Sequence, residues 1–151
     1  MSKVKENLKL GLTMILIGVL LLYIVFQLFI PDMTVKVFGF KPYIVVTESM
    51  EPVLNVDDMV VTRKFNLDEA EEGDIITFNA DINYDGTYEV VTHYIYSITG
   101  SDDNTVIRTN RYFENTDNTV PDTWFLSEED VLGSYWFTIP RIGLVTRFLK
   151  S

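Results

Sequence analysis

The first 31 residues divide into a short charged segment and a long apolar segment. Lys3, Lys5 and Lys9 belong to the charged segment, and residues 10–31 carry no charge. The apolar core, residues 10–30, would extend about 30 Å as an α-helix, because a helix rises about 1.5 Å per residue. Since that length covers the hydrocarbon core of a bilayer, we predict a transmembrane helix over residues 10–30.

A cleaved secretory signal peptide is the competing interpretation of this segment. The apolar region of a signal peptide is usually about 7 to 15 residues long and ends at a cleavage site of small residues. The apolar run here is longer, and it ends in Gln27, Leu28, Phe29, Ile30 and Pro31 without such a site. We therefore expect the segment to be retained as an anchor.

The charges that flank the span predict its orientation. The basic residues before it are opposed by a single acid, Glu6, and positively charged flanks stay in the cytoplasm. Lys36 and Lys41, on the far side, weaken this asymmetry only slightly. We expect residues 1–9 to be cytoplasmic and residues 31–151 to form one domain outside the cell membrane.

Beyond the span, the pattern changes to short runs rich in Val, Ile, Thr, Tyr and Phe, which is typical of β-strands. Turn residues separate the runs, which cover residues 43–46, 59–62, 74–78, 88–98, 106–109 and 131–138. Residues 32–41 are expected to be a short connection, with Gly39 as a helix breaker. Helical turns are indicated only at residues 68–72 and 127–130. The pattern predicts an all-β domain on a single N-terminal helix.

Net charge and cysteine content exclude several classes of function. The formal net charge is −10, and the domain beyond the span is more acidic still, because three of the basic residues precede the span. Nucleic acid is therefore not an expected partner, since phosphates are bound by basic surfaces. The chain has no cysteine, which excludes disulfides, thiol catalysis and thiolate metal sites.

Ser49 and His93 are the candidates for nucleophilic chemistry. Ser49 precedes Met50, Glu51 and Pro52, where the fixed φ of proline marks a turn that can present a hydroxyl to solvent. A serine hydroxyl needs a base to remove its proton, and His93, the chain's single histidine, titrates near neutrality. A structural serine and a partly buried histidine are the alternative interpretation of these two residues.

The residues around His93 predict which side chains share its face of a strand. Strand alternation puts Val91, His93 and Ile95 on one face, and Thr92 and Tyr94 on the other.

A third group would be a carboxylate that holds the imidazole tautomer and stabilises its charged form. Residues 108–124 supply three acids, Glu114, Asp117 and Asp122, in a loop that is otherwise typical of a solvated surface.

A partial calcium-loop pattern lies between two of the predicted strands. Asp81, Asn83 and Asp85 precede Gly86 in the spacing D-x-N-x-D-G. The twelfth position, which should be a bidentate Glu, is Thr92, and strands rather than helices flank the loop. A hairpin with Asp85 and Gly86 in its turn is the alternative, so calcium remains a weak candidate here.

Taken together, these features resemble a type I signal peptidase over essentially the whole chain. A basic N-terminus and one span come first, followed by the segments TESMEP (47–52), GDIITF (73–78), VVTHYIY (90–96), the acid-containing loop and VLGSYWFTIPRIG (131–143). The family's serine motif is S-x-S-M-x-P, and Thr47 here replaces its first Ser. The resemblance implies that Ser49 is the nucleophile, with the Thr47 hydroxyl and the Ser49 backbone N–H as oxyanion donors.

The resemblance also implies a histidine base. One branch of the family uses lysine, and another, with endoplasmic-reticulum, archaeal and some Gram-positive members, has a T-H-R-like motif. Thr92 and His93 are similar to the second branch, whereas Tyr94 replaces the usual Arg. The family's acidic motif, T-K-G-D-x-N with a second Asp, is poorly matched. Asp122 aligns with the second Asp and Asp117 with the first, so Asp122 is the expected third member and Asp117 the alternative.

The function implied is a membrane-bound serine endopeptidase that needs no cofactor and removes signal peptides from exported preproteins. A non-catalytic, membrane-anchored β domain that binds exported proteins and a calcium-binding module are the alternatives. The C-terminal stretch is apolar but interrupted by Arg141 and Arg147, so it is too short to span a bilayer. It can form either a surface that enters the membrane interface or part of the core, through Trp136, Phe137, Ile139, Leu144, Val145, Phe148 and Leu149.

Overall fold

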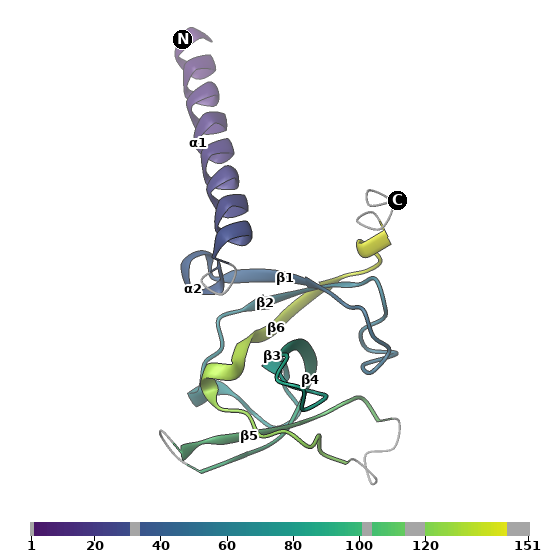
Figure 1. The fold of residues 1–151 in the computed structure, drawn as a ribbon. Helices are drawn as coiled ribbons and strands as arrows, with labels where there is room; N and C mark the ends of the chain where they lie inside the picture. Colours follow the sequence, from purple (N-terminus) through teal and green to yellow (C-terminus); the bar gives the residue numbers. More distant parts are fainter. Residues whose placement is uncertain (1, 31–33, 101–103, 114–119, 145–151) are drawn as a thin grey trace.

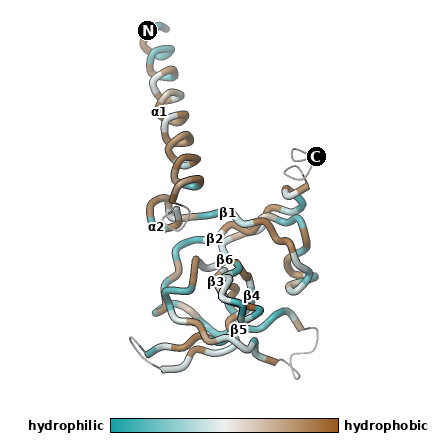
Figure 2. The backbone as a smooth tube through the Cα atoms, viewed as in Figure 1, coloured by the Kyte–Doolittle hydropathy of each residue, from teal (hydrophilic) through white to brown (hydrophobic). Residues whose placement is uncertain are grey.

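A long helix stands away from a β-domain in the computed structural model, which describes residues 2–30, 34–100, 104–113 and 120–144 (Figure 1). The helix, α1, covers Ser2–Phe29 and is long and apolar enough to cross a membrane. Hydrophobic residues dominate much of its length (Figure 2), and most of their side chains are exposed. Water would strongly oppose that exposure, whereas a lipid bilayer would cover it. The geometry is therefore compatible with the predicted anchor.

The expected connection after the anchor is instead a short helix, α2, over Thr34–Phe38. Its residue Phe38 packs edge-on against Tyr23 and Phe26 of α1, at centroid distances of 5.0 and 5.5 Å. Thr34 and Val35, at the start of the same helix, are buried. These tertiary contacts favour a helical turn that the local sequence did not indicate, and Gly39 follows it with a φ of +81°.

The β-domain is built on a single antiparallel sheet of six strands in the order β1-β2-β6-β3-β4-β5. The strands are β1 (Phe40–Ile44), β2 (Met59–Arg63), β3 (Ile75–Ala80), β4 (Glu89–Thr99), β5 (Val106–Asn110) and β6 (Val131–Ile139). Two short 3₁₀ turns, η2 (Leu67–Glu69) and η5 (Glu128–Asp130), confirm the two predicted helical turns. The all-β prediction is thus confirmed, and only β1 is shifted, starting at Phe40 opposite Arg63.

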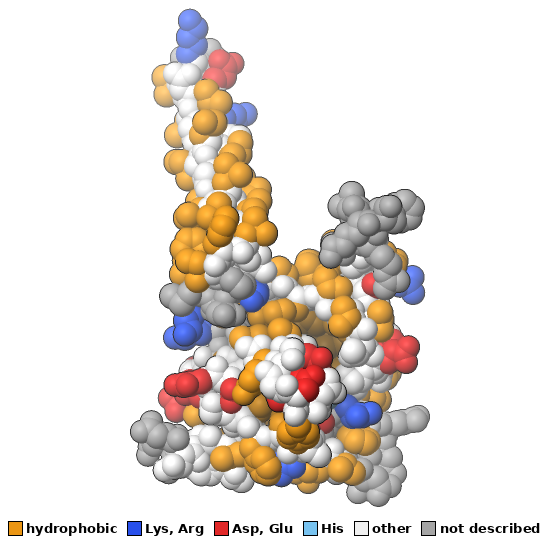
Figure 3. Space-filling model, in the orientation of Figure 1, with side chains coloured by type: hydrophobic (Ala, Val, Ile, Leu, Met, Phe, Trp, Pro, Cys, Tyr) orange, Lys and Arg blue, Asp and Glu red, His pale blue; other side chains and the backbone are white. Residues whose placement is uncertain are grey.

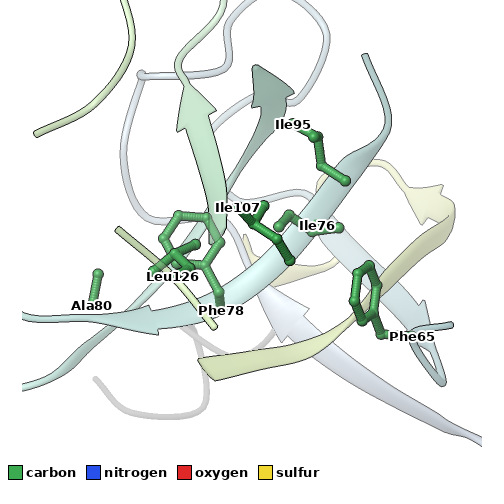
Figure 4. Close-up of a cluster of buried hydrophobic side chains, with 7 residues drawn as sticks. All are labelled: Phe65, Ile76, Phe78, Ala80, Ile95, Ile107 and Leu126. Carbon is green, nitrogen blue, oxygen red and sulfur yellow. The ribbon is translucent and has the colours of Figure 1, made fainter. Parts of the chain in front are cut away.

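The strands close around a hydrophobic cluster drawn from distant parts of the chain (Figure 4). Its buried members are Phe65, Ile76, Phe78, Ala80, Ile95, Ile107 and Leu126. The predicted alternation of β4 is confirmed, because His93 and Ile95 are both buried and Val91 packs against the same cluster. A second, smaller cluster consists of Met50, Leu54 and Val60.

Several apolar side chains remain exposed near the end of β6. Trp136, Phe137 and Leu144 are exposed, and Trp136 packs edge-on against Phe137 at 5.1 Å. Hydrophobic side chains also gather on the side of the domain from which α1 rises (Figure 3). This exposure favours the membrane-interface interpretation for these three residues. Val145, Phe148 and Leu149 lie outside the described residues.

Asp58 links the turn that follows Ser49 to the end of β6. One carboxylate oxygen accepts the backbone N–H of Asn55 at 3.0 Å, and the other accepts that of Arg141 at 2.9 Å. Burial alone would raise the pKa of Asp58, but these hydrogen bonds outweigh it and hold the pKa below its usual value of 3.8. The ionised carboxylate is therefore the form that stabilises the fold.

We predict that Asp58→Ala lowers the melting temperature of the full-length protein in detergent micelles by about 4 °C or more at pH 7. Two backbone N–H groups lose their acceptor, which lowers the free energy of unfolding by about 1 kcal/mol or more. A loss of about 1 kcal/mol lowers the melting temperature of a domain of this size by about 4 °C. Folding lowers the pKa of Asp58, so this carboxylate adds its full contribution to stability above the pKa that it has in the unfolded chain. The contribution disappears as the pH falls through the lower pKa that it has in the folded protein.

The difference between wild type and Asp58→Ala should therefore shrink when thermal melts are repeated well below pH 4. Asp68→Asn, at an exposed position in η2, is the matched control and should change little at either pH. An Asp58→Ala penalty that is the same at both pH values would contradict this assignment.

Candidate active site

Ser49 lies in a turn that is held from both sides. The backbone N–H groups of Val53 and Leu54 both donate to the carbonyl of Met50, at 2.9 and 3.0 Å. The Met50 side chain is only 2 % exposed and packs with Leu54 in the smaller core cluster. The carbonyl of Ser49 accepts the N–H of Tyr112 at 3.0 Å. The Ser49 hydroxyl therefore extends from a backbone that its buried neighbour and a distant loop both restrain.

His93 lies in β4 opposite Ile76 of β3 and is only 4 % exposed. Its Nε2 atom is 3.1 Å from Ser49 Oγ, and its Nδ1 atom is 2.7 Å from Asp122 Oδ2. Both ring nitrogens of a buried imidazole thus have hydrogen-bond partners. The arrangement joins a hydroxyl, an imidazole and a carboxylate in the order used for nucleophilic catalysis by serine.

Asp122 reaches His93 because residues 122–126 run along β5. The N–H of Asp122 donates to the carbonyl of Thr109 at 2.7 Å, and Leu126 exchanges two backbone hydrogen bonds with Ile107. The Arg108 side chain donates to the carbonyl of Asp122 at 2.7 Å. Since β5 pairs with β4, this irregular addition brings Asp122 to the strand that carries His93.

Sequence reasoning missed two side chains that contact this chain of groups, Thr109 and Trp124. The Thr109 hydroxyl donates to Asp122 Oδ2 at 2.7 Å, and the Trp124 indole N–H donates to the Thr109 oxygen at 2.9 Å. The Trp124 ring also lies roughly parallel to the His93 ring, with centroids 6.2 Å apart and an interplanar angle of 28°. No role was predicted for either residue, because their contacts depend on non-local pairing with β5.

The Thr47 hydroxyl is 3.3 Å from Ser49 Oγ, so the two residues expected to supply oxyanion donors lie side by side. Ser49, His93 and Trp124 line a cleft of about 780 Å³. Apolar side chains make up much of its remaining wall, namely Val45, Val46, Ile82, Val90 and Val91. An apolar cleft with a few polar groups at one point is a common form of ligand-binding site.

The other acidic candidates have no described contact with His93. Asp117 and Glu114 are outside the described residues, so the choice between Asp117 and Asp122 rests on the contacts of Asp122 alone. Asp81 and Asp85 lie in the connection between β3 and β4, where both Asp81 oxygens accept backbone N–H groups of the same loop. Within the described residues, no group of three or more His, Asp or Glu side chains is arranged to hold a metal ion.

Comparison with known proteins gives two similarities. The family described as "Signal peptidase, peptidase S26" matches residues 13–113, a range that contains Ser49 and His93 but ends before Asp122. The chain is also 31 % identical, over 100 residues, to the protein named "Signal peptidase I W" of Bacillus subtilis (strain 168). That alignment covers 66 % of this chain and 48 % of the relative, so the chain matches about half of the relative's length.

We predict that Met50→Ala lowers the free energy of unfolding by about 2–4 kcal/mol, because a buried Met truncated to Ala leaves a cavity. Met50→Leu, which conserves volume, should cost less than about 1.5 kcal/mol. Urea unfolding of full-length protein in detergent measures both values. A loss below about 1 kcal/mol for Met50→Ala would show that the core does not hold the Ser49 turn in this way.

Proposed function

The chain belongs to the signal peptidase family, peptidase S26, whose model matches residues 13–113, and from this premise we propose that it is a membrane-anchored serine endopeptidase. Its proposed activity is removal of N-terminal signal peptides from exported preproteins. The observation that carries the proposal is the continuous hydrogen-bond chain from Ser49 through His93 to Asp122 at the wall of an apolar cleft.

In the proposed reaction, His93 Nε2 takes the Ser49 proton while Ser49 Oγ attacks the scissile carbonyl. Asp122 keeps the imidazole oriented and stabilises its charged form. The Thr47 hydroxyl and the Ser49 backbone N–H stabilise the oxyanion, where one donor is typically worth about 2.7–4 kcal/mol. His93 then protonates the leaving amine. Water, deprotonated by the same imidazole, hydrolyses the acyl-enzyme and releases the new carboxylate.

The two sides of the cleft support binding of an extended peptide. β1 is at one end of the strand order, and residues 89–92 of β4 pair with β3 alone among the described strands. The edge of a sheet can bind a peptide by adding it as another strand. The apolar lining favours small or apolar side chains over charged ones. This combination suits the segment around a signal-peptide cleavage site.

The anchor supports a substrate that lies in the same bilayer. Confining enzyme and preprotein to one membrane raises their effective concentration without any new contact. The lysines that precede the span favour a cytoplasmic N-terminus, which puts the β-domain on the side where exported chains emerge. We therefore propose a single-pass location with the site outside the cytoplasm.

We predict that Ser49→Ala and His93→Ala each reduce preprotein cleavage by several orders of magnitude. The double variant should be little worse than either, because the two residues act as a unit. The assay is single-turnover cleavage by the full-length protein reconstituted in lipid vesicles. Ser97→Ala, a substitution elsewhere on β4, is the control. Near-wild-type turnover by His93→Ala would refute the proposed base.

A further prediction separates the two acidic candidates. Asp122→Asn should lower kcat about 100-fold or more with little change in KM, because an amide no longer selects the productive imidazole tautomer. Asp117→Asn should have a much smaller effect. The two variants are compared in the same assay, with folding checked by thermal melts. A larger loss for Asp117→Asn would mean that Asp117 supports His93.

A further inference from the structure

We propose that Trp124 and Thr109 form a positioning pair that selects the tautomer of His93 and thereby prepares Ser49 for attack. The inference deepens the proposed function and rests on it for its catalytic consequence. Its basis is the direction of the hydrogen bonds that run from Trp124 through Thr109 and Asp122 to His93. Neither residue has been assigned a role by the motifs described above.

Trp124 fixes the donor-to-acceptor direction of this series of hydrogen bonds. An indole N–H can only donate, so the Thr109 oxygen, 2.9 Å away, must accept. The single hydroxyl hydrogen of Thr109 is then available for Asp122 Oδ2 at 2.7 Å. Since Thr109 is fully buried, no water competes for that hydrogen.

The same direction continues to the nucleophile. An ionised Asp122 can only accept, so the hydrogen between it and His93 belongs to Nδ1. A neutral imidazole with its hydrogen on Nδ1 has a free lone pair on Nε2. That lone pair faces Ser49 Oγ at 3.1 Å and can take its proton. The obligatory donor in Trp124 thus favours the one tautomer in which His93 is a base toward Ser49.

Trp124 also restrains the imidazole through its ring. The His93 ring is 6.2 Å from the Trp124 ring and 6.3 Å from the Phe78 ring, and these two rings are also 6.3 Å apart, so the three rings pack as a triangle. Trp124 therefore acts in two ways. Its N–H orients Asp122 through the Thr109 hydroxyl, and its ring packs against the imidazole of His93. Both contacts originate from one side chain, which couples the orientation of Asp122 to that of His93.

The test is ¹⁵N NMR of the full-length protein in detergent micelles, with only histidine labelled. Because the chain contains a single histidine, its two ring resonances need no assignment by mutation. At a pH where the imidazole is neutral, wild type should show a protonated Nδ1 and an unprotonated Nε2. Thr109→Val, which removes the hydroxyl at nearly constant volume, should give resonances averaged between the tautomers.

Kinetics on the same variants should show a matching loss. Thr109→Val should lower kcat about tenfold or more with KM unchanged, as expected for a lost hydrogen bond to a charged group. Thr109→Ser, which restores the hydroxyl, should recover most of the tautomer preference and of kcat. Trp124→Phe keeps a ring beside His93 but removes the N–H, so it should weaken the Nδ1–H preference as well.

Thr62→Val is the matched control. Thr62 is also a fully buried strand threonine, and its hydroxyl donates to the Lys41 carbonyl at 3.0 Å, away from His93. It should cost stability without changing the His93 resonances. The proposal would be overturned if Trp124→Phe and a folded Thr109→Val both kept the wild-type His93 resonances and the wild-type kcat. If Thr109→Val does not fold, the result for Trp124→Phe alone decides.

These outcomes are distinguishable from failure of the proposed function. If wild type cleaved no preprotein while the His93 resonances still responded to Thr109→Val, the positioning pair would stand and the peptidase proposal would fall. If Ser49→Ala abolished cleavage but neither Thr109→Val nor Trp124→Phe changed the resonances or kcat, the peptidase proposal would stand and the positioning pair would fall.

Discussion

A buried imidazole requires a partner at each ring nitrogen, and this requirement organises the polar part of the β-domain. His93 is on the face of β4 that packs against the main hydrophobic cluster, where water is largely excluded. An unpaired polar group in such a place would cost about 1–3 kcal/mol. Ser49 satisfies Nε2 and Asp122 satisfies Nδ1. The same contacts that make His93 tolerable in the core are those that make it a candidate base.

Each partner is delivered by a different part of the fold. The buried side chain of Met50 fixes the turn that presents Ser49, and hydrogen bonding of residues 122–126 along β5 presents Asp122. Trp124 lies between the hydrophobic cluster and the polar groups, because it packs against the cluster while its N–H reaches Thr109. Packing and polar geometry are therefore coupled through a few residues, and a loss of packing is expected to disturb the site.

Much of the fold could be predicted from the sequence, since its signals are local. The apolar run before Pro31 and the β-branched and aromatic composition of the strands needed no tertiary information. The helix at Thr34–Phe38 could not be predicted in the same way, because aromatic contacts with α1 stabilise it. The resemblance to signal peptidases supplied Ser49 and His93 by matching motifs, and the geometry joins them by a hydrogen bond.

The carboxylate that contacts His93, and the side chains that contact this carboxylate, were harder to predict. Asp122 and Asp117 lie in a loop without the family's usual motif, and only the irregular pairing with β5 brings Asp122 to His93. No role could be predicted for Thr109 and Trp124, since a threonine in a strand and a tryptophan in a loop are ordinary core residues. Their contribution depends on which atoms meet after closure of a long loop, and that information is not local.

The central claim is that Ser49 and His93 are hydrogen-bonded to each other, and that Asp122 supports His93 by a second hydrogen bond. Because the chain has no cysteine, Ser49→Cys introduces a single thiol whose reactivity reports on this contact. The most direct measurement is its alkylation rate by iodoacetamide as a function of pH, in full-length protein, with and without His93→Gln. We predict that the thiol reacts at lower pH when His93 is present, because an imidazolium stabilises the thiolate. Identical pH profiles in the two backgrounds would contradict the claim.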